Sequence, residues 1–512
     1  MADTKRETER KFEFTPADGK RAGKARREVP DLTGTAAVAA VSDQGTVDLD
    51  AVYYDTPDLR LAADGLTLRR RTGGKDEGWH LKLPVSPGVR DEVSAPLADT
   101  LPRALASLVR SRVRDGALEP QVRLVSSRRL SHLLDADGAL LAELSIDAVR
   151  AERGGTAASW TEVEVELADG VDPALLDSIE KTFRKAGLRV SDAPSKLARA
   201  LDETGAAPPP PTADAAPEDG TAGAYVLAYL AEQRAALIAQ DPAVRRDLPD
   251  SVHQMRVATR RLRSAFKTYR KVLDRAVTDP IGEELRWLAA ELGIDRDQEV
   301  LLERIRTALG ELPRTLVIGP VRGRLRVWNN SRRSDSRRRT VAALDSGRHL
   351  ALLDSLDALL AAPPLRKHAA RPARSVLPQA VLHDFDRLAE RIAAALELEP
   401  GGARDLALHE ARKAAKRARY AAEAATPALG KPAKHLAKAV KSVQTLLGDH
   451  QDGVVAREAL RGLAVQAAAA GESAFTWGVL YAREETRARL DEEQLPGVWA
   501  DATAPRLRAG LT

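Results

Sequence analysis

The sequence predicts a multidomain α+β protein, with an N-terminal antiparallel β-barrel followed by an all-helical C-terminal domain. Up to about residue 204, short segments alternate polar and apolar residues, as strands do. From residue 223 onward, apolar residues recur at helical spacing, and the good helix formers Ala, Leu and Arg are abundant. Residues 205–222 are rich in Pro and Ala, so we expect domains at 1–204 and 223–510 joined by this linker.

The composition of the 512-residue chain is globular, with 44% hydrophobic and 30% charged residues. The 79 basic residues barely exceed the 74 acidic ones, so a strongly basic surface requires an uneven distribution. The absence of cysteine excludes disulfides and thiolate chemistry. The charged N-terminal segment does not resemble a signal peptide, and no apolar run approaches the roughly 18 residues of a membrane span. We therefore expect a soluble, cytoplasmic protein.

The N-terminal domain is expected to contain seven or eight strands. Alternation occurs in residues 7–14, 46–56, 66–71, 79–83, 122–128, 140–147 and 160–167. Asp-Gly and Gly-Gly pairs lie between several of these segments and favour tight hairpin turns. Short connections between successive strands are typical of an antiparallel sheet or barrel.

Charged residues occupy one face of several of these strands. Glu162, Glu164 and Glu166 alternate with valines, whereas Arg69 and Arg71 share a face of another strand. A solvated outer face would explain any single strand. The segregation of acids from bases favours another interpretation, because carboxylates are oxygen ligands for Mg²⁺ or Mn²⁺ and arginines bind phosphate groups. The set as a whole is typical of a phosphoryl-transfer site.

The segment Glu7-x-Glu9-x-Lys11 carries a family resemblance. It resembles the ExExK signature of the CYTH, or triphosphate tunnel metalloenzyme, family, and the resemblance covers about residues 4–204. The further matching motifs are YYDTP at 53–57, LTLRRR at 66–71, HLK at 80–82, RR at 128–129, ID at 146–147, EVEVE at 162–166 and SK at 195–196. ExExK alone is weak in so charged a chain, but the ordered set is fairly specific.

The resemblance implies an eight-stranded antiparallel barrel, open as a tunnel that holds a triphosphate. The residues it implies for triphosphate binding are Lys11, Arg69, Arg71, Lys82, Arg123, Arg128 and Lys196. Those it implies for one or two Mg²⁺ or Mn²⁺ ions are Glu7, Glu9, Asp147, Glu162, Glu164 and Glu166. Lys11 would orient the attacking water, with Glu7 and Glu9 as its catalytic neighbours. The direct ligands among the three later glutamates stay open, and so does the face of the strand on which Arg123 lies.

The C-terminal domain contains an internal repeat. The motif His-x-x-Arg-x-x-x-Arg-Arg-x-Arg at 253–263 returns, with Lys for one Arg, at 409–419. Downstream of each copy, the Leu-Gly motif at 292–300 returns at 447–455, with His450-Gln451 in place of Asp295-Arg296. Two motifs that recur in the same order and at nearly the same spacing predict a duplicated helical unit.

Both copies place basic residues on one helix face. His253, Arg256, Arg260, Arg263 and Lys267 are spaced by three and four residues, and the second copy has His409, Arg412, Lys413, Lys416 and Arg419. Further basic residues are Lys434, Lys438 and Lys441, and Arg322, Arg324, Arg326, Arg332, Arg333, Arg337, Arg338 and Arg339. One such face is usually only solvated. Its recurrence favours a bound polyanion, and the scarcity of stacking aromatics favours a phosphate chain over nucleic acid.

These helical motifs resemble the CHAD family, the conserved-histidine α-helical domain, over about residues 223–510. The resemblance implies two four-helix bundles related by a pseudo-twofold axis, with a basic surface or pore for inorganic polyphosphate. The two histidines would be an alternative metal site, but neither has a second His or Cys at helical spacing.

The expected function is metal-dependent hydrolysis of inorganic triphosphate, coupled to inorganic polyphosphate binding by the helical domain. One alternative is a non-catalytic polyphosphate binder associated with polyphosphate granules. Others are an enzyme acting on nucleoside or thiamine triphosphate, an adenylate cyclase, and a helical domain that binds nucleic acid.

Overall fold

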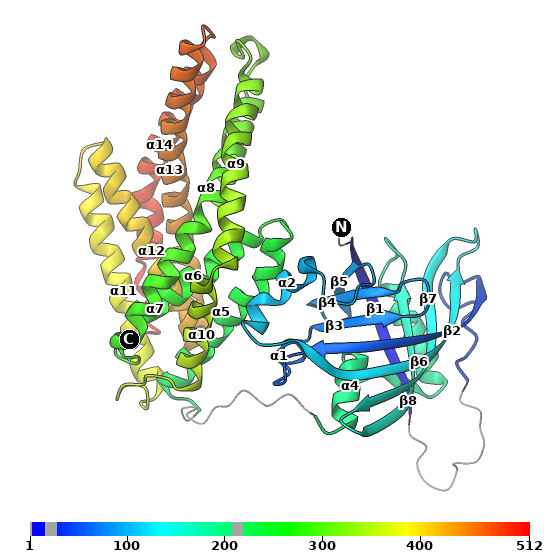
Figure 1. Ribbon diagram of the computed structural model, residues 1–512. Helices are drawn as coiled ribbons and strands as arrows, with labels where there is room; N and C mark the ends of the chain where they lie inside the picture. Colours follow the sequence, from blue (N-terminus) through cyan, green and yellow to red (C-terminus); the bar gives the residue numbers. More distant parts are fainter. Residues whose placement is uncertain (1–2, 16–27, 207–218, 512) are drawn as a thin grey trace. The chain divides into compact units, whose positions relative to one another are not determined.

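The chain forms two compact units, Met1–Pro210 and Pro211–Thr512, in a computed structural model (Figure 1). The structure describes residues 3–15, 28–206 and 219–511, without the side chains of 294–296 and 331–335. Most of the predicted linker, residues 207–218, lies outside the described residues. Within the described ranges, no helix is both long enough and apolar enough to cross a membrane.

The first unit is a closed ring of eight antiparallel strands. They are β1 (Asp3–Phe14), β2 (Ala40–Asp55), β3 (Thr67–Thr72), β4 (Gly78–Ser86), β5 (Val89–Ala95), β6 (Glu119–Leu134), β7 (Leu140–Arg153) and β8 (Thr156–Leu167). The order is β5-β4-β3-β2-β6-β7-β8-β1, and pairing of β1 with β5 closes the ring. A short strand, β9 (Leu188–Val190), pairs with the end of β1. The predicted eight-stranded antiparallel barrel is confirmed.

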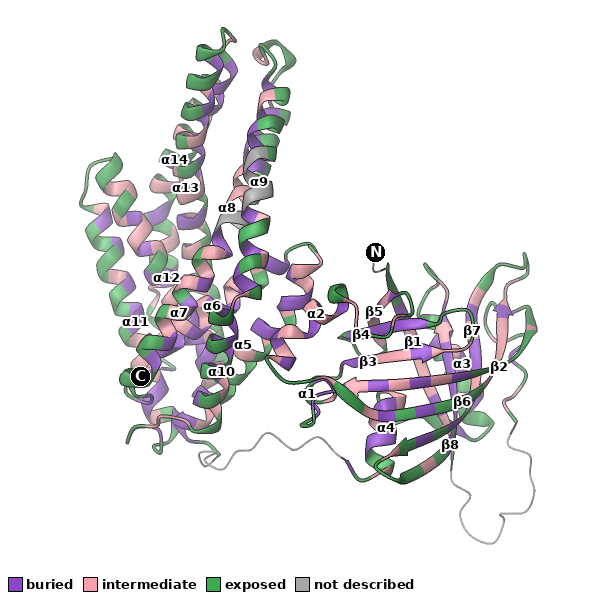
Figure 2. Cartoon of the chain, viewed as in Figure 1, coloured by how far each residue is buried: buried purple, intermediate pink, exposed green. Residues whose placement is uncertain are grey.

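Many apolar residues of these strands face outward and are covered by helices. Leu68, Leu81 and Val93 form one cluster with apolar residues of α1 (Arg60–Ala63) and α2 (Arg103–Val113). On β1 and β8, Phe12 and Val163 pack with α3 (Ala174–Lys185). Because side chains alternate along a strand, the charged residues between these positions face the interior of the barrel. The alternation of burial along the strands is visible in Figure 2.

One end of the barrel interior is filled by α4 (Lys196–Glu203). Leu197 and Leu201 of this helix form a cluster with Tyr53, Val149 and Trp160, which lie on the interior face of their strands. The Ser195 hydroxyl caps α4 by accepting a hydrogen bond from the Ala198 backbone amide, which fixes where the helix begins. The cap also sets the position of Lys196 on the first turn.

The described elements of the second unit are all helices, joined by loops and turns. Its helices are α5 (Ala222–Arg245), α6 (Ser251–Thr268), α7 (Arg275–Glu291), α8 (Gly293–Gly310), α9 (Val321–Asp345), α10 (Gly347–Ala361), α11 (Ala373–Leu396), α12 (Gly402–Leu429), α13 (Lys431–Ala469) and α14 (Phe475–Ala502). Two short 3₁₀ turns, Arg314–Leu316 and Pro505–Leu507, accompany them.

The helical duplication is confirmed. By sequence position, α5, α6, α7 with α8, and α9 correspond to α11, α12, α13 and α14, whereas α10 stands between the copies. The second copy keeps α13 continuous over 39 residues, where the first is interrupted between α7 and α8. The copies share one apolar core, which includes Leu262 and Phe266 of the first and Leu436 and Val440 of the second. A second cluster joins α8 and α9 to α13 and α14.

Candidate functional site

The barrel encloses a charged cavity of about 280 Å³. Its basic lining residues are Lys5, Lys11, Arg69, Arg71, Lys82, Arg90, Arg128 and Lys196, and its acidic ones are Asp3, Glu7, Glu9, Asp76, Glu92, Glu143, Glu164 and Glu166. These side chains come from β1, β3–β8, α4 and the turn before β4. Ring closure thus brings together charges that are up to about 190 positions apart in the sequence.

Lysines neutralise the carboxylates on one side of the cavity. Lys11 Nζ lies 3.2 Å from Glu9 Oε1 and contacts Glu164, its cross-strand partner on β8. Lys196 Nζ lies 2.6 Å from Glu164, and 3.0 Å from both Asp147 and Glu162. Each ammonium group therefore bridges several carboxylates that would otherwise repel one another.

Burial and neighbouring charges shift the pKa values of these carboxylates in different directions. Burial raises the pKa of Glu7 to about 7, although Lys82, 2.5 Å away, opposes the shift. Burial likewise raises the pKa of Glu162 against the pull of Lys196. For Glu9 and Glu164, burial is outweighed by nearby lysines, Lys11 foremost, and the pKa is lowered. Buried carboxylates that their lysine partners neutralise only in part, as at Glu7 and Glu162, fit a divalent cation such as Mg²⁺ or Mn²⁺.

Arginines and a lysine line the other side. Lys82 lies 3.1 Å from Glu92, and Arg69 NH1 donates a hydrogen bond to the Tyr53 hydroxyl at 3.3 Å. Arg71 donates to the Asp76 carbonyl at 2.9 Å, and burial and then Arg69 lower its pKa to about 10. A group with so high a pKa is still charged at neutral pH, and a phosphate group beside Arg71 would relieve its repulsion by Arg69.

The structure places most of the predicted tunnel residues in or beside this cavity. Glu7, Glu9, Lys11, Arg69, Arg71, Lys82, Arg128, Glu164, Glu166 and Lys196 line it. Asp147 and Glu162 are buried beside it, where both contact Lys196. Arg128 makes a bidentate pair with Asp147 at 2.7 and 2.8 Å. Glu166 pairs with Lys5 at 2.6 Å and is more exposed than the other two glutamates of β8. The roles of all these residues stay predictions.

The structure places Arg123 away from the triphosphate site that the family resemblance implied for it. It lies on the outer face of the barrel, where its guanidinium pairs with Asp50 at 2.6 Å and its side chain is 54% exposed. The reason is the period of the strand, because the neighbouring Leu124 and the later Arg128 occupy the inner face of β6. Arg123 is therefore not positioned to bind a triphosphate inside the barrel.

Strand β5 supplies residues that the motifs missed. Arg90 and Glu92 line the cavity, and Glu92 lies 2.6 Å from His80 Nδ1 as well as 3.1 Å from Lys82. Burial opposes ionisation of Glu92, but Lys82, His80 and Arg69 outweigh it and lower its pKa. The available signal was a partial alternation over residues 89–95, in which Val89, Val93 and Ala95 share a face but the charged Asp91 interrupts the apolar pattern.

The two copies of the helical motif face one cavity of about 440 Å³, which we call the basic cradle. It is lined by His253, Arg256, Arg260, Asp297, Val300, Leu301 and Arg304 of the first copy, and by His409, Arg412, Lys416, Gln451, Asp452 and Val455 of the second. Arg256 pairs with Asp297 at 2.8 Å and Arg412 with Asp452 at 3.4 Å. His409 Nδ1 lies 2.7 Å from the Gln451 amide oxygen. The duplication therefore builds a two-sided pocket.

A second basic cavity adjoins the cradle, since Arg260 and Lys416 line both. Its other basic residues are Arg263, Lys267, Arg387, Arg391, Lys413 and Arg417. Burial and then the neighbouring Arg412 and Arg260 lower the pKa of Lys416 to about 7. Burial also lowers the pKa of Arg263 and Lys267. In the barrel most cations have raised pKa values beside carboxylates, whereas here cations crowd one another, which an anion would relieve.

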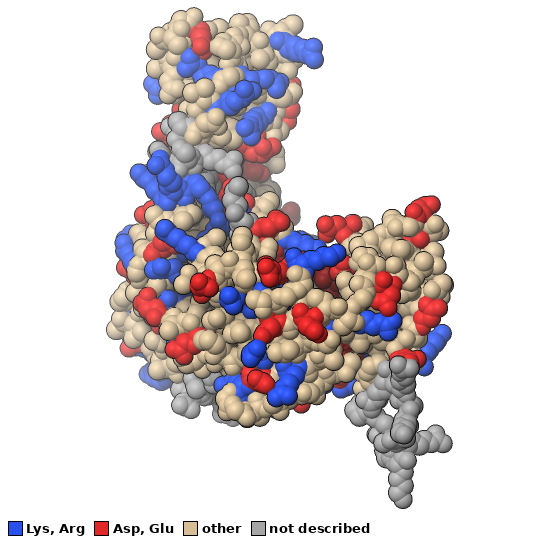
Figure 3. All heavy atoms as spheres, turned by 45° about the vertical axis from the view of Figure 1, so that its right-hand side comes forward, with Lys and Arg blue, Asp and Glu red and all other residues tan. Residues whose placement is uncertain are grey.

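Other predicted basic residues lie outside these two cavities. Arg419 pairs with Glu423 at 3.1 Å, and Lys434, Lys438 and Lys441 are exposed on α13. The side chains of Asp295, Arg296, Arg332 and Arg333 lie outside the described residues. The predicted arginines between Arg322 and Arg339 lie on α9, and Arg324 among them pairs with Glu472 at 2.7 Å. On the face shown in Figure 3, basic and acidic side chains are interspersed.

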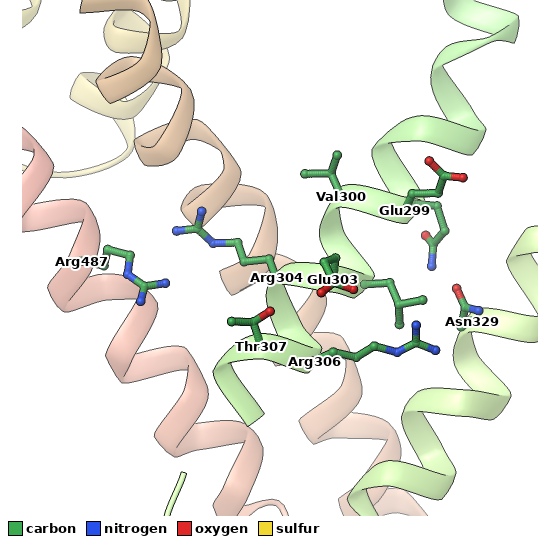
Figure 4. Close-up of a pocket in the computed structure, with 10 residues that line it drawn as sticks. Glu299, Val300, Glu303, Arg304, Arg306, Thr307, Asn329 and Arg487 are labelled. Carbon is green, nitrogen blue, oxygen red and sulfur yellow. The ribbon is translucent and has the colours of Figure 1, made fainter. Parts of the chain in front are cut away.

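A further cavity, of about 610 Å³, lies between α8, α9 and α14. Arg304, Arg306 and Arg487 line it together with Glu299 and Glu303, so its charges are mixed. Figure 4 shows Arg306 pointing toward Asn329 of α9. Arg304 lines both this cavity and the basic cradle, although its guanidinium is paired with Glu484 at 2.7 Å.

Comparisons with known proteins agree with the geometry. The CYTH domain family matches residues 5–201, and the CHAD domain family matches residues 228–461. Two uncharacterized proteins of Mycobacterium tuberculosis, MT2285 and Rv2226, are each 40% identical over 488 residues, which is 91% of this chain and 92% of theirs. This chain therefore belongs to the CYTH–CHAD proteins, as the motifs predicted. Its N-terminal unit is a domain of the triphosphate tunnel metalloenzyme family.

Two solved structures are also similar. PptA from Streptomyces chartreusis is 23% identical, with a TM-score of 0.47, and the match covers 55% of this chain and 99% of that one. HpAC1 from Hippeastrum, which is described as having a dominant triphosphatase activity, is 17% identical, with a TM-score of 0.26. That match covers 38% of this chain and 95% of HpAC1.

Proposed function

We propose that the barrel hydrolyses inorganic triphosphate with Mg²⁺ or Mn²⁺, and that the helical unit binds inorganic polyphosphate. The observation that carries the first part is the gathering of many carboxylates and many basic side chains in one cavity inside the barrel. Carboxylates bridged by Lys11 and Lys196 lie on one side, and Arg69, Arg71 and Lys82 lie on the other. That arrangement suits a phosphate chain and a cation held side by side.

The basic side chains would bind and orient the phosphates. Arg69, Arg71, Lys82 and Arg128 converge on the cavity from three strands, and none of them is more than about a quarter exposed. Because these side chains are already held in place, three or four cations can position the phosphate chain of the substrate without large rearrangement. Such positioning is the main contribution a protein makes to phosphoryl transfer. Lys11, between Glu9 and Glu164, would orient the attacking water toward the terminal phosphoryl group.

The residues proposed to hold the metal are Glu7, Glu9, Asp147, Glu162, Glu164 and Glu166. A bound Mg²⁺ or Mn²⁺ ion supplies neutralisation of phosphate charge and lowers the pKa of a bound water. The carboxylates contribute position and charge. Their lysine partners would then shift toward the substrate phosphates, which replace the carboxylates as counterions.

Inorganic triphosphate is preferred over nucleoside or thiamine triphosphate because the lining is charged. Among the described lining residues, only Tyr53 and His80 carry rings, and both already hydrogen-bond within the wall. No apolar slot for a base is part of this lining, and adenylate cyclase activity would require one.

The test is a hydrolysis panel of tripolyphosphate, ATP, thiamine triphosphate and long-chain polyphosphate with Mg²⁺ and Mn²⁺. We expect tripolyphosphate to be hydrolysed fastest, and Glu9→Gln to abolish that activity. Full activity of Glu9→Gln would show that the site is wrongly assigned. Absence of turnover on every substrate, together with tight polyphosphate binding, would favour the non-catalytic binder associated with polyphosphate granules.

The proposal for the helical unit rests on the basic cradle and its adjoining cavity. Equivalent His and Arg residues of both copies face one pocket, and the path continues through Arg260 and Lys416. Tyr420 is the one aromatic residue lining either cavity in the described part, so base stacking has little support. Competition between long-chain polyphosphate and single-stranded RNA at matched salt tests this preference. Displacement of polyphosphate by equimolar RNA would overturn it.

A further inference from the structure

The second helical copy contains a mixed cluster of possible metal ligands that neither proposed activity uses. Asp405 at the start of α12, His450 in the middle of α13 and Glu492 on α14 each offer one ligand atom, and these atoms all lie within 4.8 Å of one another. α12 packs on α13, and α13 packs on α14. The cluster therefore joins three helices.

The three ligand atoms converge. His450 Nε2 lies 3.3 Å from Asp405 Oδ1 and 3.3 Å from Glu492 Oε1. An ionic hydrogen bond between a ring nitrogen and a carboxylate is usually shorter, about 2.7–2.9 Å. Around a tetrahedral Zn²⁺ ion with bonds of about 2.0–2.1 Å, neighbouring ligand atoms are separated by about 3.3–3.4 Å. The two observed separations match this spacing.

The carboxylates are oriented by arginines that bind their other oxygens. Arg404 pairs with Glu492 Oε2 at 3.1 Å, and Arg457 pairs with Asp405 Oδ2 at 3.1 Å. The inner oxygens are thereby left to His450. Hydrogen-bonding partners that hold ligating carboxylates in this way are a regular feature of metal sites. The two arginines also offset the carboxylate charges. Selectivity for a metal that accepts nitrogen therefore comes from the imidazole of His450 and not from net negative charge.

The ion-pair contacts of His450 with Asp405 and Glu492 are both made by its Nε2 atom. Its side chain is 2% exposed, and its Nδ1 atom has no hydrogen-bond partner among the described residues. Nearby, Oδ2 of Asp491 is also buried without a partner in the described part of the chain, and Asp491 interacts electrostatically with His450. Buried polar groups are costly to leave uncompensated, and a metal ion at Nε2 would offset the burial of the imidazole on the side that faces Asp405 and Glu492.

The first copy lacks these residue types. At the positions equivalent to Asp405 and His450 it has Pro249 and Asp295. The cluster is therefore not required by the duplicated fold.

We propose that Asp405, His450 and Glu492 form a site for a divalent transition-metal ion of the Zn²⁺ type, separate from the metal site proposed in the barrel. A nitrogen ligand beside two carboxylates favours such an ion over Mg²⁺ or Ca²⁺. The ion cross-links α12, α13 and α14 at His450, one residue before Gln451 and two before Asp452, both of which line the basic cradle. Zinc binding thus stabilises the second wall of the cradle.

The test is zinc binding to the full chain after removal of metals with a chelator. Isothermal titration and metal content after dialysis are compared for the wild type, His450→Asn, Glu492→Gln and Glu493→Gln, an exposed neighbour on α14 that serves as the matched control. We expect the wild type and Glu493→Gln to bind one more equivalent of Zn²⁺ than the two ligand variants, or to bind it about tenfold or more tightly. Equal stoichiometry and affinity in all four proteins would overturn the proposal.

Two further measurements keep the test decisive. X-ray absorption at the zinc edge of the wild type should show an imidazole nitrogen among the ligands, whether or not a variant folds. An all-oxygen shell at one equivalent would overturn the assignment. The ligand variants should retain Mg²⁺-dependent tripolyphosphate hydrolysis, because the barrel does not contain them. Failure of the barrel proposal, seen as no hydrolysis by the wild type, leaves the zinc measurements unaffected.

Discussion

Lys11 and Glu164 are direct cross-strand partners on β1 and β8, and their charged groups meet inside the barrel. Glu164 also lies 2.6 Å from Lys196 and 3.2 Å from Arg128, so one carboxylate joins cations from three elements. Burial opposes the charge of Lys11, but Glu164, Glu9 and Glu162 outweigh burial and raise its pKa. The ammonium group of Lys11 is therefore a fixed positive charge between the carboxylates.

Lys11→Gln should lower kcat for tripolyphosphate by about 10²-fold or more, the usual effect of removing an electrostatic group aimed at the reacting atoms. Initial rates at saturating Mg²⁺ measure this. Glu9 and Glu164 would lose a partner, but Lys196 still neutralises Glu164, so the free energy of unfolding should fall by less than the about 3–5 kcal/mol of a fully broken buried pair. An unchanged kcat in a folded variant would remove Lys11 from the mechanism.

Arg71 and Arg123 form a matched pair for testing which face of the barrel binds substrate. Arg71 lines the cavity, whereas Arg123 pairs with Asp50 outside it. Arg71→Ala should weaken tripolyphosphate binding by about 10–100-fold, because a hydrogen bond to a charged group contributes about 1.5–3 kcal/mol. Arg123→Ala should leave KM and kcat unchanged. Steady-state kinetics at fixed Mg²⁺ compare them, and equal effects of both substitutions would contradict an interior site.

The barrel could be predicted from the sequence only as far as the alternation of odd and even positions along each strand allows. Alternation correctly grouped Glu162 with Glu164, and Arg69 with Arg71, because side chains two residues apart always share a face. Alternation does not say which face is inside, and that was inferred from charge segregation and the CYTH resemblance. The face of Arg123 stayed open at the sequence level, because a one-residue error in register reverses the face. The β5 strand escaped notice although its pairing with β1 closes the ring.

The helical unit shows a different limit. The repeat predicted the duplication, since two motifs recurred in order. It could not predict that His253 and His409 line the same cavity, because this depends on how the copies pack across their shared core. Nor could it reveal the contact of His450 with Asp405 and Glu492, because these residues are more than 40 positions apart in the sequence and carry no common motif.

Lys416 predicts a pH dependence of polyphosphate binding. Its pKa of about 7 means that it is charged in the free protein below neutral pH and largely neutral above it. A bound polyanion favours the charged form, so above about pH 7 binding must take up a proton, and affinity should fall by at most tenfold per pH unit from this one group. Dissociation constants for long-chain polyphosphate between pH 6 and 9, at constant ionic strength, measure this.

Lys416→Arg is the control for that titration, because an arginine stays charged throughout this range and is the residue of the first copy. The variant should show a flatter profile and the tighter binding at pH 9. An identical pH profile in both proteins would assign the titration to another group. In the wild type without ligand, the unfolded chain holds the Lys416 proton between about pH 7 and 10 while the folded chain has lost it, so this group raises the free energy of unfolding with pH over that window.

The two units should be functionally separable. Arg260 and Lys416 line the basic cradle and the basic cavity that adjoins it, so Arg260→Ala combined with Lys416→Ala should weaken polyphosphate binding. The slope of log K against log salt concentration should become shallower by about one to two. Lys438→Ala with Lys441→Ala removes the same formal charge from exposed positions of α13 and should have a smaller effect, since solvent screens those lysines. Both double variants should hydrolyse tripolyphosphate at the wild-type rate. Loss of turnover in the cradle variant, with the exposed-lysine variant unaffected, would mean that the barrel depends on the cradle.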